Sequence, residues 1–171
     1  LSITHSIGHG VPIVISKHAE ALVASGYHVI IAGPKADTEL EYPGCERLIV
    51  NNSKDAAVLA VKNEVDIIMP HTMPFFGVVR HVGNYPHVIC YDHGEPSPDF
   101  FNDSEARRKQ LEAKNYDLQF AKNLYAISDA IAAESAVPVT GVIPEGNTHL
   151  EVWSNEAARR REQVRRDRGW D

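Results

Sequence analysis

The chain has 171 residues, of which 43% are hydrophobic and 23% charged, so it is long enough for one domain with a sizeable core. A formal net charge of −6 argues against nucleic-acid binding, which favours basic surfaces, and no apolar run approaches the roughly 20 residues that span a bilayer. Six arginines fall in 151–171 alongside five acidic residues, and we interpret this stretch as a solvated helix face, with a nucleic-acid or membrane patch as the alternative.

Short apolar runs alternate with helical patterns along the chain. Most of the apolar runs are continuous, which is typical of strands buried on both faces of a parallel sheet. The fold class that this order predicts is α/β, a Rossmann-like doubly wound and mostly parallel sheet of about seven strands with helices on both faces. Strands are expected at 1–4, 28–33, 47–50, 65–70, 87–92, 123–128 and 140–144, and helices at 11–26, 53–64, 103–123 and 128–136.

Capping residues mark several of the expected helix ends. Pro12 stands at the start of the first helix and Gly26 at its end, as a C-cap. Ser53 and Ser128 are the N-caps expected for two later helices. Cys45 and Cys90 lack metal-ligand spacing, and a reduced thiol at Cys90 inside an apolar strand agrees with a cytoplasmic protein.

Four of the nine histidines stand where predicted strands end. His5 and His9 follow the first strand, His71 follows the fourth and His93 the fifth. Ligands of open parallel sheets bind beyond the carboxyl ends of the strands, so these side chains are candidates for one site. For any one of them, a hydrogen-bonded loop histidine is the alternative. Zinc binding is disfavoured because neither HExxH nor paired cysteines occur.

The stretch "GHG" at 8–10 lies between the first strand and the first helix. Its glycines would let the backbone approach an anion at a helix N-terminus, which makes it a candidate phosphate-binding turn. A plain tight turn is the alternative. The stretch is not GxGxxG, and no acidic residue ends the second strand, so a standard dinucleotide site is disfavoured.

The stretch "YDHGEPSPDFF" is the densest polar cluster of the sequence. Asp92, His93 and Glu95 follow a buried strand, and a carboxylate beside an imidazole could orient it or raise its pKa. The alternative is a rigid loop in which Asp92 forms local hydrogen bonds. No GxSxG occurs, so a hydrolase triad is disfavoured.

Taken in order, these pieces resemble the N-terminal domain of a family 4 glycosyltransferase of the GT-B fold. The family's glycine turn, helix and following strand are matched by "GHGVPIVISKHAEALVASGYHVIIAGP", and its "D.V..H" strand by "VDIIMPHT". Its next strands are matched by "HVICYDHGEP", "LYAISDAIAAE" and "GVIPEGNTHLEVW". The closing stretch "RRREQVRRDRGWD" resembles the helix and turn that precede the first strand of the family's second domain. The resemblance covers essentially the whole chain.

This resemblance implies the acceptor-binding half of a retaining glycosyltransferase, with 1–150 as the Rossmann-like N-terminal domain. Residues 151–171 would be a helix or linker toward an absent C-terminal domain that binds the nucleotide sugar. His93 would be catalytic and face the transferring sugar, Gly8 and Gly10 would lie near the diphosphate, and His71 would line the acceptor side. The full set implied for substrate binding is Gly8, His9, Gly10, His71, Asp92, Glu95 and Glu145.

The implied enzyme needs no cofactor and no metal, and its partners are a nucleotide sugar and a sugar, lipid or small-molecule acceptor. Peripheral contact with a membrane is compatible with a lipid acceptor. Two departures stand out: His9 splits the family's glycine pair, and Glu145 replaces an asparagine. The alternatives are a stand-alone Rossmann-like binding module, a subunit completed by a partner chain, and a metal-dependent hydrolase.

Overall fold

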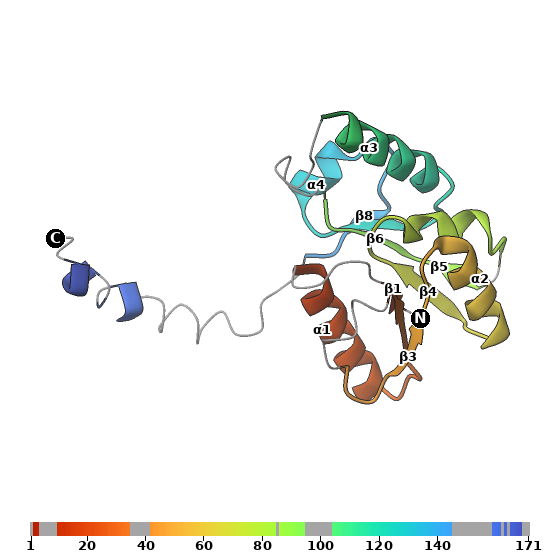
Figure 1. Ribbon diagram of the computed structural model, residues 1–171, viewed down its shortest axis with the longest axis horizontal. Helices are drawn as coiled ribbons and strands as arrows, with labels where there is room; N and C mark the ends of the chain where they lie inside the picture. Colours follow the sequence, from red (N-terminus) through yellow and green to blue (C-terminus); the bar gives the residue numbers. More distant parts are fainter. Residues whose placement is uncertain are drawn as a thin grey trace.

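The computed structural model describes residues 2–3, 10–34, 42–84, 86–94, 104–144, 159–161, 163 and 165–168. Strands and helices alternate along the chain, as the sequence predicts (Figure 1). The elements are β1 (Ser2–Ile3), α1 (Gly10–Ala24), β2 (Ile30–Gly33), β3 (Glu46–Ile49), α2 (Ser53–Lys62), β4 (Ile67–Pro70), the 3-10 helix η2 (Phe75–Arg80), β5 (His87–Val88), β6 (Cys90–Asp92), α3 (Ser104–Leu118), β7 (Leu124–Ala126), α4 (Asp129–Glu134) and β8 (Gly141–Val142).

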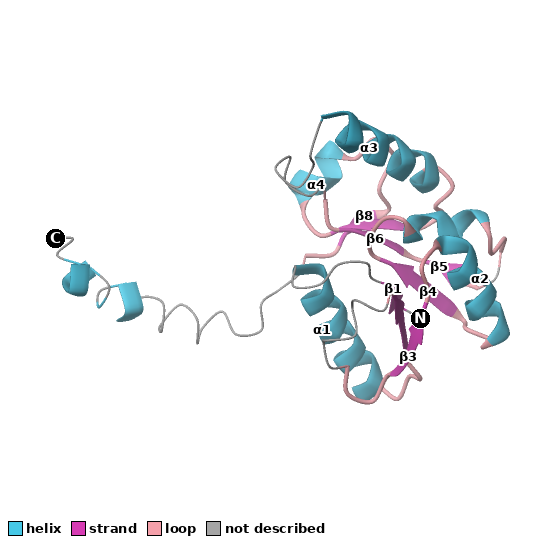
Figure 2. Cartoon of the chain, viewed as in Figure 1, coloured by secondary structure: helices cyan, strands magenta, loops and turns pink. Residues whose placement is uncertain are grey.

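All described strand pairs are parallel, which confirms the predicted α/β class with a parallel sheet. The strands form a five-stranded sheet in the order β3-β2-β1-β4-β5 and a three-stranded sheet in the order β6-β7-β8. Figure 2 shows these strands lying between the helices. The prediction of one strand at 87–92 is wrong, because that run is divided into β5 and β6.

The division between the two sheets falls at a single residue. Ile89 separates β5 from β6, and its N–H donates to the Ile68 carbonyl at 2.9 Å, on the side of β4. The next N–H, that of Cys90, donates to the Asn123 carbonyl at 2.8 Å, on the side of β7. One extended run therefore pairs with β4 through its first half and with β7 through its second.

Helices cover both faces of β2. Successive strand side chains point to opposite faces, and the buried residues of β2 divide accordingly. Ile30 and Ala32 pack in one core cluster with Ala56 and Ala60 of α2, whereas Ile31 packs in another cluster with residues of α1. In Figure 1, α1 and α2 lie on opposite sides of β1 and β3. The continuous hydrophobicity of β2 thus reflects burial on both faces.

Of the four residues expected to mark helix ends, Gly26 and Ser128 do so, whereas Pro12 is the third residue of α1. Gly26 ends α1 at φ +86°, and the Tyr27 N–H donates to the Leu22 carbonyl at 3.1 Å, which is the Schellman arrangement. Ser128 caps α4 by accepting from the Ile131 N–H at 3.3 Å.

The N-cap predicted for α2 is wrong by one residue. Asn52, not Ser53, has the extended cap conformation, with φ −154° and ψ 167°. Its side-chain oxygen accepts from the Asp55 N–H at 2.9 Å, so it satisfies a donor of the first helical turn. Ser53 is the first residue of the helix. Both residue types cap well, so the sequence alone did not separate them.

The element η2 has no counterpart among the predicted elements. Its Phe75, Phe76 and Val78 are buried, and Arg80 Nε donates to Asp117 Oδ1 of α3 at 2.7 Å. Gly77 lies where a Cβ atom would come within 2.7 Å of Ser53 Oγ in α2. This helix therefore fills the space between α2 and α3, and its backbone at Gly77 lies close to Ser53 of α2.

The remaining predictions concern Cys90 and the C-terminal stretch. Cys90 is fully buried in β6, as expected for a thiol inside an apolar strand, and burial is the first cause that raises the pKa of its thiol to about 12. In 151–171, the described residues 159–161 and 165–168 are helical and exposed, as the arginine pattern predicts. Among the residues that the structure describes, no helix is long and apolar enough to cross a membrane.

Candidate functional site

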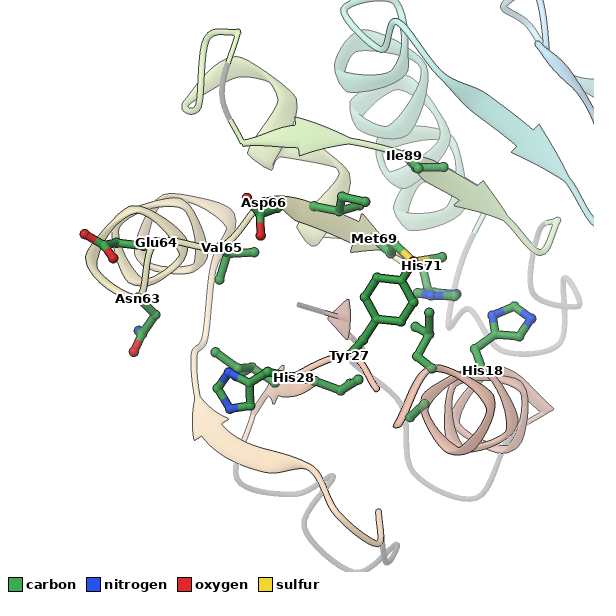
Figure 3. A pocket seen from close by; sticks show the side chains of 15 residues that line it. His18, Tyr27, His28, Asn63, Glu64, Val65, Asp66, Met69, His71 and Ile89 are labelled. Atoms are coloured by element: carbon green, nitrogen blue, oxygen red, sulfur yellow. The ribbon is translucent and has the colours of Figure 1, made fainter. Parts of the chain in front are cut away.

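Four aromatic rings meet where β4 and β6 end, and we call them the histidine cluster: His18, His71, Tyr91 and His93. His18 projects from α1, His71 directly follows β4, Tyr91 lies in β6 and His93 directly follows it. The ring centroids of the contacting pairs are 5.2 to 6.0 Å apart. Figure 3 shows the His18 and His71 rings side by side.

Strand geometry explains why these side chains meet. Tyr91 and His93 are two residues apart in an extended segment, so they project from the same face. His71 reaches that face from β4, which contacts β6. The Tyr91 hydroxyl donates to the Ile143 carbonyl at 2.7 Å, just beyond β8, and this bond fixes the ring around which the three imidazoles pack.

The central contact of the cluster joins His71 Nδ1 and His93 Nε2 at 2.9 Å. The other ring nitrogen of His71, Nε2, is buried and has no hydrogen-bond partner among the described residues. A neutral imidazole carries one proton, and a buried N–H without an acceptor is rarer than a buried acceptor without a donor. We therefore assign the His71 proton to Nδ1, which donates to His93, and the His93 proton to its Nδ1.

Burial keeps these imidazoles neutral. His71 is 1% exposed, and burial, with lesser contributions from His93 and His18, holds its pKa well below the usual range. Burial lowers the pKa of His93 to about 4, and it also lowers that of His18. At neutral pH the cluster thus offers hydrogen-bonding nitrogens with no positive charge.

The Asp92 carboxylate forms hydrogen bonds within the protein. Its Oδ1 accepts from Lys114 Nζ at 2.8 Å and from the Gly94 N–H at 2.9 Å, and both Asp92 and Lys114 are buried. Asp92 raises the pKa of His93, as the sequence suggested, but burial outweighs this effect and the net shift is downward. The bond from the Gly94 N–H is local hydrogen bonding of the kind that the sequence analysis gave as the alternative to a functional Asp92.

Of the residues implied for catalysis or binding, the structure brings His71, Asp92 and His93 together. Gly10, the last residue of the "GHG" stretch, is the first residue of α1. Gly8, His9, Glu95 and Glu145, as well as His5, lie outside the described residues.

Sequence reasoning missed three residues of this region. His18 was placed inside a helix without a role, and only the packing of α1 against the sheet brings it to His71. Tyr91 could have been found from its i, i+2 spacing to His93. Lys114 gave no signal, because a lysine in a highly charged helix is expected to be solvated, yet it is 7% exposed.

A cavity with a volume of about 420 Å³ lies mainly at the opposite ends of the strands. It runs along α1 and the residues that precede β2 and β4, and only His18 and His71 connect it with the histidine cluster (Figure 3). Its position is next to the amino end of β1, away from the edge where parallel sheets bind ligands. The lining residues include Leu22, Tyr27, Val29, Val65, Ile67 and Met69.

Metal binding and similarity to known proteins give no further assignment. Within the described ranges, no group of three histidine, cysteine, aspartate or glutamate side chains could hold a metal ion. No protein-family model matches the chain, and no curated protein matches it significantly.

Proposed function

We propose that the chain is the acceptor-binding half of a retaining glycosyltransferase, which transfers a sugar from a nucleotide sugar to an acceptor. The observation that carries this proposal is the hydrogen-bonded pair of neutral imidazoles, His71 and His93, directly after two strands of a parallel α/β fold. That edge is where such folds bind their ligands. The ordered motif resemblance along the chain supplies the reaction class.

The strand order supports a Rossmann-like domain. The order β3-β2-β1-β4-β5 passes through Ile89 into β6-β7-β8, so the β5–β6 run acts as one strand shared by two sheets. Counted in this way, seven strands follow one another in parallel, with helices on both faces at β2. This continuity supports the proposal of the finer form of the predicted fold, a doubly wound sheet.

In the proposed reaction His93 binds the transferring sugar. With its pKa at about 4, His93 is neutral at pH 7, and its Nδ1–H is a donor suited to a sugar hydroxyl. The role is that of a positioned hydrogen-bond donor, because an imidazole of such low basicity is a poor general base. His71 holds the ring in place through the bond to Nε2.

The leaving diphosphate would be stabilised from the turn before α1. Gly10 begins this helix, and backbone N–H groups at a helix N-terminus stabilise negative charge. Gly8 and His9 are proposed to complete the turn, and Glu95 and Glu145 to contact the acceptor. The nucleotide sugar itself would be held by a second domain, so the reaction requires both halves.

The test is a transfer assay on the complete reading frame that carries this chain, with a panel of nucleotide sugars and sugar, lipid and small-molecule acceptors. We expect metal-independent release of nucleoside diphosphate that depends on one acceptor, with retention of the anomeric configuration. Absence of transfer from every donor, with a folded protein, would contradict the proposal. Tight binding of a sugar nucleotide by this chain alone would contradict the division of labour between the two halves.

A further inference from the structure

We propose that a cavity between α3 and α4 binds an oxyanion, a carboxylate or phosphate group of a small molecule, through Arg107. The cavity has a volume of about 260 Å³. It lies against Asp92 and Gly94, beyond the carboxyl end of β6, at the edge where parallel sheets bind ligands. Its walls include Arg107, Leu111 and Lys114 of α3 and Ile131 and Glu134 of α4.

The guanidinium of Arg107 is the group that indicates an anion. Its Nε atom is buried and has no hydrogen-bond partner in the described part of the chain. Buried donors in folded proteins are nearly always paired, so an unsatisfied charged donor in a cavity wall indicates that an acceptor is brought by a ligand. A planar guanidinium fork matches the two oxygens of a carboxylate or phosphate.

The neighbouring arginine shows the opposite pattern. Arg108 is 57% exposed, its Nε donates to Glu105 at 2.9 Å, and it also forms an ion pair with Glu112. Glu105 pairs in addition with Lys109 at 3.4 Å. Glu105 and Glu112 thus pair with Arg108 and Lys109 on the solvent face of α3, whereas Arg107 lines the cavity.

The other charges of the cavity limit the ligand to a small one. Lys114 is neutralised by its buried ion pair with Asp92, so its charge does not add to that of Arg107. Glu134, exposed on the α4 side, disfavours a polyanion. Leu111 and Ile131 add apolar wall, which suits a small carbon skeleton next to the anionic group. The cavity therefore fits a small organic acid or a sugar-phosphate-sized molecule with one oxyanion.

This inference does not depend on the proposed transferase activity. Anion binding by the cavity can be measured on this chain without any donor or transfer, so each proposal can fail alone. If both hold, the acceptor is an anionic molecule, because the cavity is lined by Asp92 and Gly94, the two chain neighbours of His93 in the histidine cluster.

The experiment is a titration of the chain with inorganic phosphate and, separately, with acetate, followed by NMR or calorimetry against a sodium chloride control of equal ionic strength. We expect saturable binding of at least one anion, and the stronger of the two identifies the group. Arg107→Gln should raise the dissociation constant at least about tenfold, because a charged bidentate partner is lost. Arg108→Gln, the matched control, should leave it unchanged.

Arg107→Lys should give an intermediate dissociation constant, since it keeps the charge and loses the fork. This variant also keeps the test decisive if Arg107→Gln folds poorly, which circular dichroism of each variant will show. No saturable binding of either anion, equal binding by wild type and Arg107→Gln, or equal weakening by Arg108→Gln would each overturn the proposal.

Discussion

At the scale of single residues, the histidine cluster combines three imidazoles whose pKa values all lie below the usual value for histidine. His71 is buried, and His93 and His18 are partly buried, and burial is the first cause of the lowered pKa in each. Protonation of any one would place a cation beside two other rings. Neutral imidazoles suit a neutral ligand group bound through directed hydrogen bonds, such as the sugar hydroxyl of the proposed reaction.

The lowered pKa values predict a loss of stability in mild acid. In the unfolded chain a histidine takes up a proton near pH 6.5, whereas folded His93 does so only near pH 4. The unfolded state therefore binds more protons in this window, and the free energy of unfolding falls as the pH drops from about 6.5 to 4. The shift of His93 alone corresponds to about 3 kcal/mol.

Urea unfolding at a series of pH values measures this effect. His93→Asn should flatten the dependence of the unfolding free energy on pH, because one titrating group is removed, and the exposed His87→Asn should leave the dependence as in wild type. Parallel curves for His93→Asn and wild type would show that His93 titrates alike in both states.

The sequence predicted part of this site because strand ends can be located from hydrophobic runs. His71 and His93 were both placed after a strand, and the parallel sheet brings them to one edge. His18 and Lys114 escaped prediction because their contacts depend on which face of a helix packs inward. A histidine among the apolar residues of α1 and a lysine in the highly charged α3 do not reveal these contacts by themselves. Tertiary packing, not local propensity, gives them their contacts.

At the scale of elements, the predicted positions of strands and helices agree with the structure, and the differences have local causes. The run 87–92 reads as one apolar strand, and nothing in its composition reveals that its partner changes at Ile89. The helix η2 was not predicted, because a 3-10 helix of six residues lacks the 3.6-residue periodicity of an α-helix. Its buried phenylalanines are the signal that could have indicated it.

The position of the α2 cap leads to a prediction about stability. Asn52→Ala removes the acceptor of the Asp55 N–H and should lower the free energy of unfolding by about 1 kcal/mol. Asn51→Ala, the adjacent exposed control, should change it by less than about 0.5 kcal/mol. Chemical denaturation measures both, and equal effects of the two substitutions would argue against Asn52 as the cap.

The close packing of η2 against α2 and α3 leads to a second prediction about stability. Gly77→Ala brings a Cβ atom to 2.7 Å from Ser53 Oγ and 3.1 Å from Asp117 Oδ2, so these two side chains must move. We expect a loss of about 1 to 3 kcal/mol in unfolding free energy. The double variant Ser53→Ala/Gly77→Ala removes the nearest contact and should recover part of that loss. A single variant as stable as wild type would show that η2 packs more loosely than described.

At the scale of the whole molecule, the parallel direction of the strands explains why the candidate site residues lie close together. Because the described strands are all parallel, their carboxyl ends share one edge, where His71, His93 and the Asp92–Lys114 pair lie. The α3–α4 cavity opens beside them. The cavity of about 420 Å³ lies mainly toward the other ends of the strands, away from this edge.

The central claim is that His93 acts on the transferring sugar in the proposed glycosyltransferase, and the steady-state kinetics of His93→Ala in the complete reading frame test it most directly. We predict a fall in kcat of about 100-fold, the effect of removing one positioned donor, with little change in the donor KM. His87→Ala, at the amino end of the same β5–β6 run, should retain wild-type kinetics. An unchanged kcat for His93→Ala would contradict the account.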